Sequence, residues 1–514
     1  MSSSRHIARS AALVMALFVL SRLLGLARQV VIGALFGAGW ELDAYLAAAR
    51  IPEMIFMVVA GGSLGSAFIP TFADHLAREG RAGAWRLASA VANLTLILLT
   101  VLAAVTAIAA PFLVRTVVAP GFSPAQQTLT TDLLRLMLIS PMIFGVSGIV
   151  MGVLNAYQHF FLPALAPSIY NLSIITGAVW LGPRLGVRGI AIGTVVGAGL
   201  HLLIQTPGLL RFGVRYTPTL GRNIPGVWEV GRLMAPRVLG TAIAQINFVI
   251  NNSIASGLGE GAVSAINYAW MLMLLPQGVF AQAVGTAVFP TFAAQAARRG
   301  WDEMRHTLSV TLQAVFVLCL PATVGLIVLG RPLVSLLFER GAFETSSTEA
   351  VTWALAFYAL GLIGHAGLEI IARAFYALHD TATPVWVGGV AMGFNTLLSL
   401  TLPSVFASLG YPPHAGLALA NSIATLMELA ALVVLIQGRM GRLENEAMKG
   451  TLTKSGIAAL GMAGILFYWQ QWLPDVGPLI VGGGGIALGV LVYLGLAWLL
   501  RLRPLTWART IRSD

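Results

Sequence analysis

An apolar run from about Ala8 to Gly37 carries two arginines, and this combination restricts what the chain can fold into. The arginines stand in the stretch Ser21–Arg28 (SRLLGLAR), as Arg22 and Arg28. A run of this length without turn signals predicts a helix that crosses a membrane. Because an arginine at bilayer depth costs roughly 2.5 to 3.5 kcal/mol on insertion scales, such arginines usually face a water-filled cavity or a partner. We therefore expect the other helices to be the scaffold of this stretch.

The next apolar run also contains charged residues, Asp43, Arg50 and Glu53. Spacings of seven and three residues allow all three side chains to lie near one helical face. Three arginines against one clearly interior carboxylate leave excess positive charge, and arginine recognises phosphate with a planar, bidentate fork. The sequence thus favours an anionic ligand, and the candidate binding residues are Ser21, Arg22, Arg28, Asp43, Arg50 and Glu53. The alternative is a structural role, in which the arginines pair with carboxylates, backbone carbonyls or lipid headgroups.

Composition places the whole chain in the membrane. Of its 514 residues 57% are hydrophobic and 10% are charged, whereas soluble domains carry about 25% charged residues. The net charge of +11 is better explained by basic cytoplasmic loops than by a nucleic acid partner. The single cysteine, Cys319, excludes an intramolecular disulfide. Residues 1–9 resemble the start of a signal peptide, but the apolar stretch after them is too long, so a retained first helix is expected.

The apolar segments predict an all-α integral membrane protein with about fourteen transmembrane helices. Loops and ends on one side of these segments hold 20 lysines and arginines, and the loops on the other side hold 5. This asymmetry predicts that both termini are cytoplasmic. The predicted spans lie near 8–34, 42–74, 85–114, 129–156, 162–182, 187–210, 230–257, 261–297, 306–330, 348–378, 383–407, 414–437, 453–473 and 479–500.

An internal repeat divides the chain into two homologous lobes. Phe68–Gly80 (FIPTFADHLAREG) and Val288–Gly300 (VFPTFAAQAARRG) share seven of thirteen residues at an offset of 220. Two six-helix lobes with a site between them are a common plan of transporters. We expect an N-lobe over 1–211, an inter-lobe cytoplasmic linker over 212–229, a C-lobe over 230–437, and helices 13 and 14 with a cytoplasmic tail over 438–514.

Other polar residues of the predicted spans have plain explanations. Glu369 and Arg373 have the spacing of a neutralised i,i+4 pair, and His365 is more simply a buried hydrogen-bonding residue than a metal ligand. The amides of the seventh span, such as Asn251, suit helix packing as well as an ion or sugar site. No phosphate-binding P-loop and no metal-ligand spacing occurs, so no cofactor, no metal and no enzymatic activity are expected.

The chain resembles the MurJ/MviN family, the lipid II flippases of bacterial peptidoglycan synthesis, over essentially its whole length. The resemblance rests on motifs spread along the chain, which together are highly specific: SRLLGLAR at Ser21–Arg28, FGAG at Phe36–Gly39, Asp43-Ala44, FIPTF at Phe68–Phe72, APGF at Ala119–Phe122, LNAY at Leu154–Tyr157, PALAPSIYN at Pro163–Asn171 and AFYALHDTATP at Ala374–Pro384.

This resemblance implies the fold of the multidrug/oligosaccharidyl-lipid/polysaccharide exporter superfamily, with two lobes around a central cavity and two extra helices bordering a lipid-binding groove. It implies that Arg22 and Arg28 engage a substrate diphosphate. The chain departs from the family where an arginine of the second helix falls on Phe56 or Met57, and where one of the eighth helix falls on Met271. A carboxylate that often follows the second arginine is Gln29. For the sodium site of some members, this chain offers Asn251, Asn395 and Asn421 without an obviously matching carboxylate.

Taken together, these observations predict a flippase in the bacterial inner membrane that moves lipid II to the outer leaflet by alternating access. Because Met271 replaces an arginine, Arg237 in the seventh helix is a candidate to supply the missing charge, or it is an interfacial arginine that touches lipid phosphates. The expected partners are lipid II or a similar polyprenyl-diphosphate glycolipid, membrane lipids and, as a further option, cell-wall synthesis or division proteins. The rival functions are an exporter of another lipid-linked glycan or small molecule, a non-transporting envelope scaffold and, disfavoured by the short loops, an integral-membrane glycosyltransferase.

Overall fold

The computed structural model describes residues 2–59, 63–443, 445–473 and 476–502, with side chains described in these ranges except at 2–12, 59, 63–66, 236–237, 239–240, 243–244 and 445. Within the described ranges the chain is helical and has no strand. It divides into two compact units. The N-terminal unit comprises Met1–Val263 with Arg340–Phe343, and the C-terminal unit comprises Ser264–Glu339 with Glu344–Asp514.

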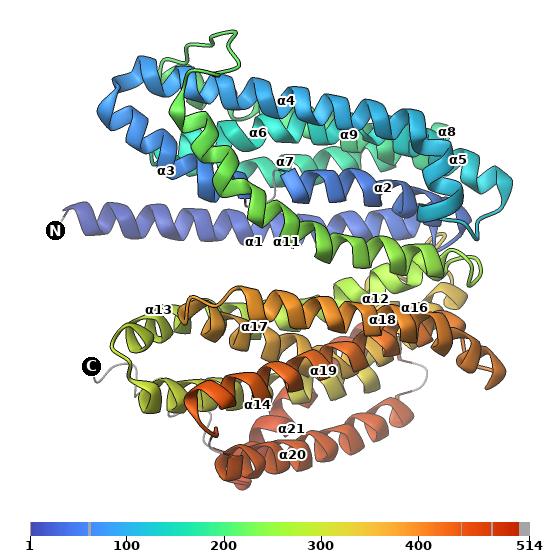
Figure 1. Cartoon of the computed structure of the whole chain (residues 1–514). Helices are drawn as coiled ribbons and strands as arrows, with labels where there is room; N and C mark the ends of the chain where they lie inside the picture. The colour runs from blue at the N-terminus through green and yellow to red at the C-terminus, as the bar shows by residue number, and fades with distance from the viewer. Residues whose placement is uncertain (1, 60–62, 444, 474–475, 503–514) are drawn as a thin grey trace. The chain divides into compact units, whose positions relative to one another are not determined.

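The N-terminal unit is a bundle of long helices joined by short turns (Figure 1). In it α1 packs on α7, α2 packs on α5 and α11, and α4 and α7 pack on α6 and α9 respectively. Its elements are α1 (Ser2–Phe36), α2 (Trp40–Val59), α3 (Ser63–Arg78), α4 (Gly80–Leu113), η1 (Val114–Val118), α5 (Pro124–Met137), α6 (Ile139–Ala156), α7 (Phe161–Thr176), η2 (Gly177–Leu181), α8 (Gly182–Leu185), α9 (Val187–Leu203), α10 (Thr206–Arg211) and α11 (Pro225–Ala255), where η denotes a π-helix.

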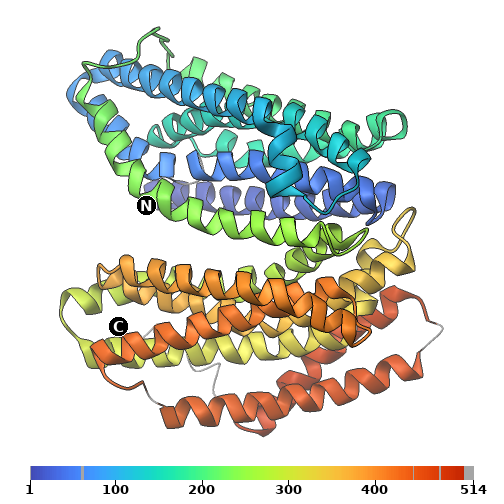
Figure 2. The same cartoon turned by 45° about the vertical axis from the view of Figure 1, so that its right-hand side comes forward.

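The C-terminal unit begins inside α12 and is also a bundle of long helices (Figure 2). In it α19 packs on α16, α17 and α18, and α20 packs on α14 and α21. Its elements are α12 (Ala262–Gln277), η3 (Gly278–Gln282), α13 (Ala283–Ala297), α14 (Trp301–Val328), α15 (Gly330–Phe338), α16 (Thr345–Leu360), α17 (Leu362–Ala377), α18 (Ala382–Ser408), α19 (Pro413–Met440), α20 (Asn445–Trp472), η4 (Leu479–Gly484) and α21 (Gly485–Leu499).

Eleven helices of the described ranges are long and apolar enough to cross a membrane, and the bent pair of α16 and α17 makes up to twelve. The all-α, polytopic prediction is therefore confirmed, while the count of about fourteen remains a prediction. The second predicted span corresponds to α2 and α3. Its first half, α2, contains the charged residues Glu41, Asp43, Arg50 and Glu53. These residues, three of which belong to the candidate site, make α2 too polar to count among the eleven apolar helices.

Large aromatic residues form one core of the N-terminal unit, where α3, α4 and α6 meet. Phe68 and Phe72 are fully buried. The Phe72 ring meets Trp85 edge-on at 6.2 Å between centroids, and it meets Tyr157 in the same way at 6.0 Å. Phe292, which the repeat aligns with Phe72, is also fully buried in the C-terminal unit. The shared motif thus supplies a core aromatic residue in both units.

The repeat also fixes a turn. Gln158 and His379, which are 221 residues apart, both have a positive φ, 57° and 58°. In each copy the next residue donates its backbone N–H to the carbonyl five residues earlier, from His159 to Leu154 and from Asp380 to Phe375. This is the usual hydrogen-bond pattern of a helix that ends in a left-handed residue. The two units therefore close α6 and α17 with the same backbone geometry.

In each unit a later segment of the chain contacts this turn, and the two contacts differ in kind. In the N-terminal unit Tyr157 stacks on Phe212, with 4.5 Å between ring centroids and 5° between planes. In the C-terminal unit Arg439 pairs with Asp380 at 2.6 Å. Thr383 completes the second contact, because its backbone N–H and its hydroxyl both donate to Asp380. These hydrogen bonds, with the nearby Arg439 charge, hold the pKa of Asp380 below its usual value.

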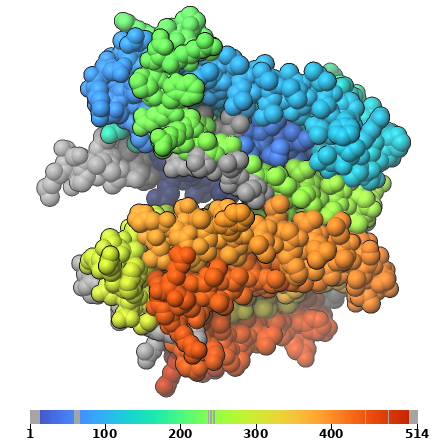
Figure 3. All heavy atoms as spheres, viewed as in Figure 1, coloured from blue at the N-terminus to red at the C-terminus, as the bar shows by residue number. Residues whose placement is uncertain are grey.

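The segment 212–229, which the sequence predicts to be an inter-lobe linker, is tied to α4. This helix runs along the surface of the N-terminal unit (Figure 3) and has 34 residues, or about 51 Å at 1.5 Å per residue. The hydrocarbon core of a bilayer is about 30 Å thick, so part of an upright helix of this length extends beyond it. On the first half of α4, Asn93 Nδ2 donates to the Thr219 carbonyl at 2.9 Å and Tyr216 donates to Asn93 Oδ1 at 3.0 Å.

Candidate functional site

Arg28 lies on the face of α1 that packs toward α7. Ser21 and Arg28 are seven residues apart in an unbroken helix and therefore share a face. The Ser21 carbonyl on this face accepts a hydrogen bond from Asn171 of α7 at 3.4 Å. The charges of Arg28 and Glu53 both act on the phenol groups of Tyr45 and Tyr170. Arg28 and Glu53 are therefore brought to one region of the N-terminal unit.

Arg22 does not share this face. It precedes Arg28 by six residues, and six steps of 100° place the two side chains about 120° apart around the helix. Arg22 is exposed, whereas Arg28 is half-buried. Within the described part of the chain, neither guanidinium has a hydrogen bond or an ion pair. The two arginines are therefore not one binding fork, although both keep their charge available.

The pair predicted in α2 is present. Arg50 Nη1 lies 3.5 Å from Glu53 Oε2, and the side chains are 20% and 60% exposed. The Arg50 guanidinium also lies over the ring of Phe248 in α11, 5.9 Å from its centroid. Because Glu53 neutralises one of the three arginine charges, two positive charges of α1 and α2 are left over.

Asp43 takes part in a different contact, near the start of α2. It is fully buried, and its Oδ2 accepts the backbone N–H of Gly261 at 2.7 Å. The adjacent Glu260 accepts the N–H of Trp40 at 3.2 Å. Asp43 therefore joins the first turn of α2 to the segment that enters α12. Its predicted role in substrate binding is untested, and the observed contact gives it a positioning role.

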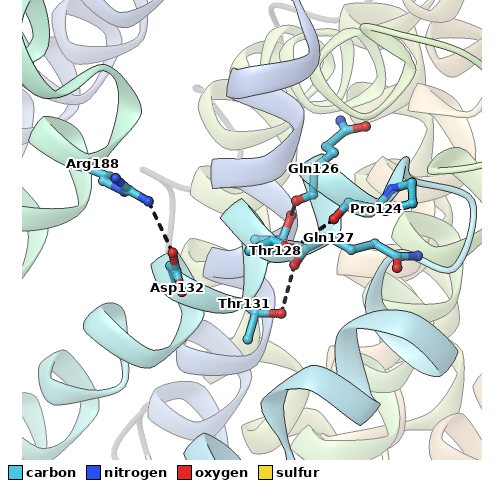
Figure 4. Close-up of polar contacts among 8 residues, drawn as sticks. Pro124, Gln126, Gln127, Thr128, Thr131, Asp132 and Arg188 are labelled. Atoms are coloured by element: carbon cyan, nitrogen blue, oxygen red, sulfur yellow. Dashed lines mark hydrogen bonds and ion pairs between the residues drawn. The ribbon is translucent and has the colours of Figure 1, made fainter.

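More polar contacts surround this end of the N-terminal unit. Gln126 of α5 donates to the Trp40 carbonyl at 3.0 Å, and Asn252 of α11 donates to the Val118 carbonyl at 2.9 Å. On the other side of α5, Asp132 pairs with Arg188 of α9 at 3.1 Å (Figure 4). Asn252 thus serves helix packing, one of the two roles that its sequence allows. The start of α2 is held from several elements at once.

Three further positions concern arginines that the family resemblance expects: Arg237, Phe56 and Met271. Arg237 lies in α11, but its side chain is outside the described residues, so the hypothesis of a replacement charge keeps its standing as a prediction. Phe56 packs on Phe144 with 5.0 Å between ring centroids, which places an aromatic contact where the resemblance expects an arginine. Met271 of α12 is half-buried.

The C-terminal unit contains the expected polar pairs. Arg373 Nη1 lies 2.5 Å from Glu369 Oε1, which confirms the i,i+4 pair. The His365 ring forms a hydrogen bond with Asn421 at 3.0 Å, as expected of a buried hydrogen-bonding residue. No group of three His, Cys, Asp or Glu side chains in the described ranges could hold a metal ion.

Sequence reasoning missed three residues. Tyr45, whose hydroxyl lies 3.2 Å from Thr194 Oγ1, and Tyr170 both lie within reach of the Arg28 charge. Their spacing carries no signal that a sequence alone could reveal, because the helices that bring them to Arg28 are distant in the chain. The third residue, Glu428, is the only acidic residue of the apolar helix α19. That isolation was a signal, and it was overlooked.

An all-helical, multi-pass membrane protein with intramembrane arginines belongs among the transport proteins in which polar residues in spans line a substrate path. The family model described as "Lipid II flippase MurJ" matches residues 32–480. The chain therefore belongs to the MurJ family. The match begins after Arg22 and Arg28, so it covers α2 but not the two arginines of α1.

Relatives and solved structures agree with this assignment. The chain is 33% identical to "Lipid II flippase MurJ" of Burkholderia cenocepacia over 82% of each protein, and 29% identical to "Probable lipid II flippase MurJ" of Vibrio cholerae over 97% of each. It is similar to a structure titled "Lipid II flippase MurJ, inward closed conformation", with a TM-score of 0.79 and 26% identity over 95% of this chain and 99% of the other. A multidrug resistance transporter structure of the MATE family shares the fold, with a TM-score of 0.67 and 17% identity over 85% of this chain and 99% of the other.

Proposed function

We propose that this chain is a flippase that moves lipid II, the undecaprenyl-diphosphate-linked peptidoglycan precursor, from the inner to the outer leaflet by alternating access. Membership of the MurJ family supports the substrate. We place the protein in the bacterial inner membrane with both termini in the cytoplasm, because its loop cations are distributed so unevenly. It is a transporter without a catalytic step of its own.

The observation that supports the proposed site is that Arg28 is partly buried without a partner of opposite charge among the described residues. It is half-buried at the depth of a membrane span, and within the described part of the chain it has no ion pair. An unpaired guanidinium in this position is expensive unless a ligand or water meets it. We assign the substrate diphosphate to the region of Arg28 and Arg50, with Arg22 and Ser21 adjoining and Glu53 holding Arg50 in place.

Two departures from the family pattern favour a second candidate, the transport of another lipid-linked oligosaccharide on the same fold. Phe56 packs on Phe144 at 5.0 Å, and Met271 stands where the family resemblance expects another arginine. Both changes remove positive charge that a diphosphate would use. A substrate with a smaller anionic group or with more apolar surface would fit such a chain better.

Complementation distinguishes the two candidates. A strain depleted of its own lipid II flippase should grow when it expresses this chain, and its accumulated lipid II should become accessible at the outer leaflet. Expression without growth, at normal membrane levels of the protein, would favour the second candidate. The Arg28→Ala variant should fail in the same assay, which links the activity to the proposed site. Partner proteins of cell-wall synthesis or division would be sought by cross-linking in the complemented strain.

A further inference from the structure

Glu428 is a charged residue of the C-terminal unit that has no charged partner within the described ranges. It lies near the middle of α19, which spans Pro413–Met440 and is one of the candidate membrane spans. It is half-buried, and within the described part of the chain its carboxylate has no hydrogen bond and no ion pair. A bare carboxylate at this depth is strongly disfavoured, because hydrocarbon and packed helices cannot replace its hydration.

The carboxylate of Glu428 packs against Gly388 of α18, which has no side chain to occupy the same space. A Cβ added at Gly388 of α18 would lie 3.1 Å from Glu428 Oε1. That is tighter than nearly all Cβ contacts in proteins, so the lack of a side chain at Gly388 gives the carboxylate its room. Tyr376 lies near the end of α17. The charges of Glu428, Glu369 and Arg373 all act on its phenol group. We refer to Glu428, Tyr376 and the ion pair of Glu369 and Arg373 as the Glu428 cluster.

The Glu428 cluster has an odd charge. Glu369 and Arg373 neutralise each other at 2.5 Å, so the carboxylate of Glu428 is left over, and one proton makes the cluster neutral. Helix α18 contributes no titratable residue. The remaining titratable groups of α14, α16, α17 and α19 form no hydrogen bond or ion pair with Glu428 in the described ranges; they are Asp302, Glu303, Arg305, His306, Cys319, Glu349, Tyr358, His365, His414 and Arg439.

We propose that Glu428 is a proton-binding site inside the membrane span of the C-terminal unit. Its carboxylate takes one proton from water to become a neutral carboxylic acid, and it returns that proton to water when it ionises. Exchange occurs from the end of α17, where Tyr376 is 43% exposed. The charge of the Glu428 cluster thus alternates between −1 and 0. This proposal concerns the side chain itself and does not depend on which lipid the protein moves.

Infrared difference spectroscopy on the full-length protein in lipid vesicles tests the proposal. Spectra are taken between about pH 6 and about pH 9, which brackets neutral conditions. The wild type should show a carbonyl band of a protonated carboxylic acid that falls as the pH rises, and Glu428→Gln should lack it. A spectrum without such a band, or a band that is unchanged by Glu428→Gln or by pH, overturns the proposal.

Chemical labelling then locates the site. Dicyclohexylcarbodiimide reacts with protonated carboxyl groups in apolar surroundings, and peptide mass spectrometry identifies the modified residue. Glu428 should be labelled at about pH 6 and several-fold less at about pH 9. Glu369 is the matched control, because its carboxylate is paired with Arg373 and should stay unlabelled. In Arg373→Gln the control residue should become reactive. Preferential labelling of Glu369 in the wild type would contradict the assignment to Glu428.

Discussion

At the scale of single residues, the two arginines of α1 illustrate what a sequence can and cannot reveal. Their depth in an apolar run follows from the sequence, because only composition and length are needed. Their difference in burial follows from helical geometry, since a separation of six residues places the two side chains about 120° apart around the helix. The effect of the Arg28 charge on Tyr45 and Tyr170 could not be predicted, because it depends on how α1, α2 and α7 pack.

The first prediction concerns Arg28. Replacing it with alanine should lower lipid II translocation about 10- to 100-fold, which corresponds to the loss of charged hydrogen bonds to a diphosphate. Arg28→Lys should recover only part of the rate, because lysine lacks the bidentate fork. Translocation by purified protein in vesicles is the measurement. Arg135→Ala is the matched control, since the Arg135 Nε already donates to the Ala107 carbonyl at 3.1 Å. An equal loss in both variants would contradict a specific role of Arg28.

The second prediction concerns Asp43. Asp43→Ala leaves the Gly261 N–H without its acceptor and should cost about 1 to 3 kcal/mol of local stability. Hydrogen exchange measured by mass spectrometry should become faster in peptides that cover Gly257–Ala262. Glu41→Ala, in the same turn of α2, removes a carboxylate that has no hydrogen bond in the described part of the chain. It should leave this exchange unchanged, and acceleration by Glu41→Ala as well would refute the assigned contact.

At the scale of helices and linkers, the sequence predicts what hydropathy controls. The apolar segments near 85–114, 306–330 and 414–437 correspond to α4, α14 and α19, because each is predominantly apolar over a membrane's length. The subdivision of others could not be predicted. Tertiary packing decides where α16 gives way to α17 at a bend of 43°. It also decides where π-helical turns interrupt the spans.

The third prediction concerns the linker on α4. Asn93→Ala removes two hydrogen bonds, the one that Asn93 donates to the Thr219 carbonyl and the one that it accepts from the Tyr216 hydroxyl. The segment 213–223 should then become several-fold more sensitive to protease in inside-out vesicles, while the rest of the chain stays intact. Asn155→Ala is a suitable control, because it changes the same residue type in α6 without touching the linker. Unchanged cleavage of Asn93→Ala would show that the linker is held by other contacts.

At the scale of the whole molecule, the repeat was the most informative feature of the sequence. Matched motifs predicted two homologous halves, and the paired turns at Gln158 and His379 agree with that prediction down to the backbone hydrogen bonds. The boundaries of the lobes remain predictions. The chemistry of each half could not be inferred from the repeat, since duplicated helices keep their backbone while their side chains diverge, as Glu428 illustrates.

The fourth prediction is the topology. Cysteines introduced at Arg81 and at Ser346, both of which are exposed, should behave oppositely toward an impermeant thiol reagent applied from outside intact cells. Ser346→Cys should react and Arg81→Cys should react only after the cells are broken. The native Cys319 is fully buried and should give little background. Reaction of Arg81→Cys in intact cells would reverse the proposed orientation.

The unlike contacts at the two matching turns have a consequence for how the halves respond to their surroundings. The pair of Asp380 and Arg439 is electrostatic, with Arg439 partly exposed, and dissolved ions screen such attraction over about 8 to 10 Å at physiological ionic strength. The stack of Tyr157 on Phe212 is apolar and gains strength in salts such as sulfate. Rising ionic strength should therefore loosen the turn of the C-terminal unit while leaving that of the N-terminal unit closed. One duplicated scaffold would thus respond to ionic strength in two different ways.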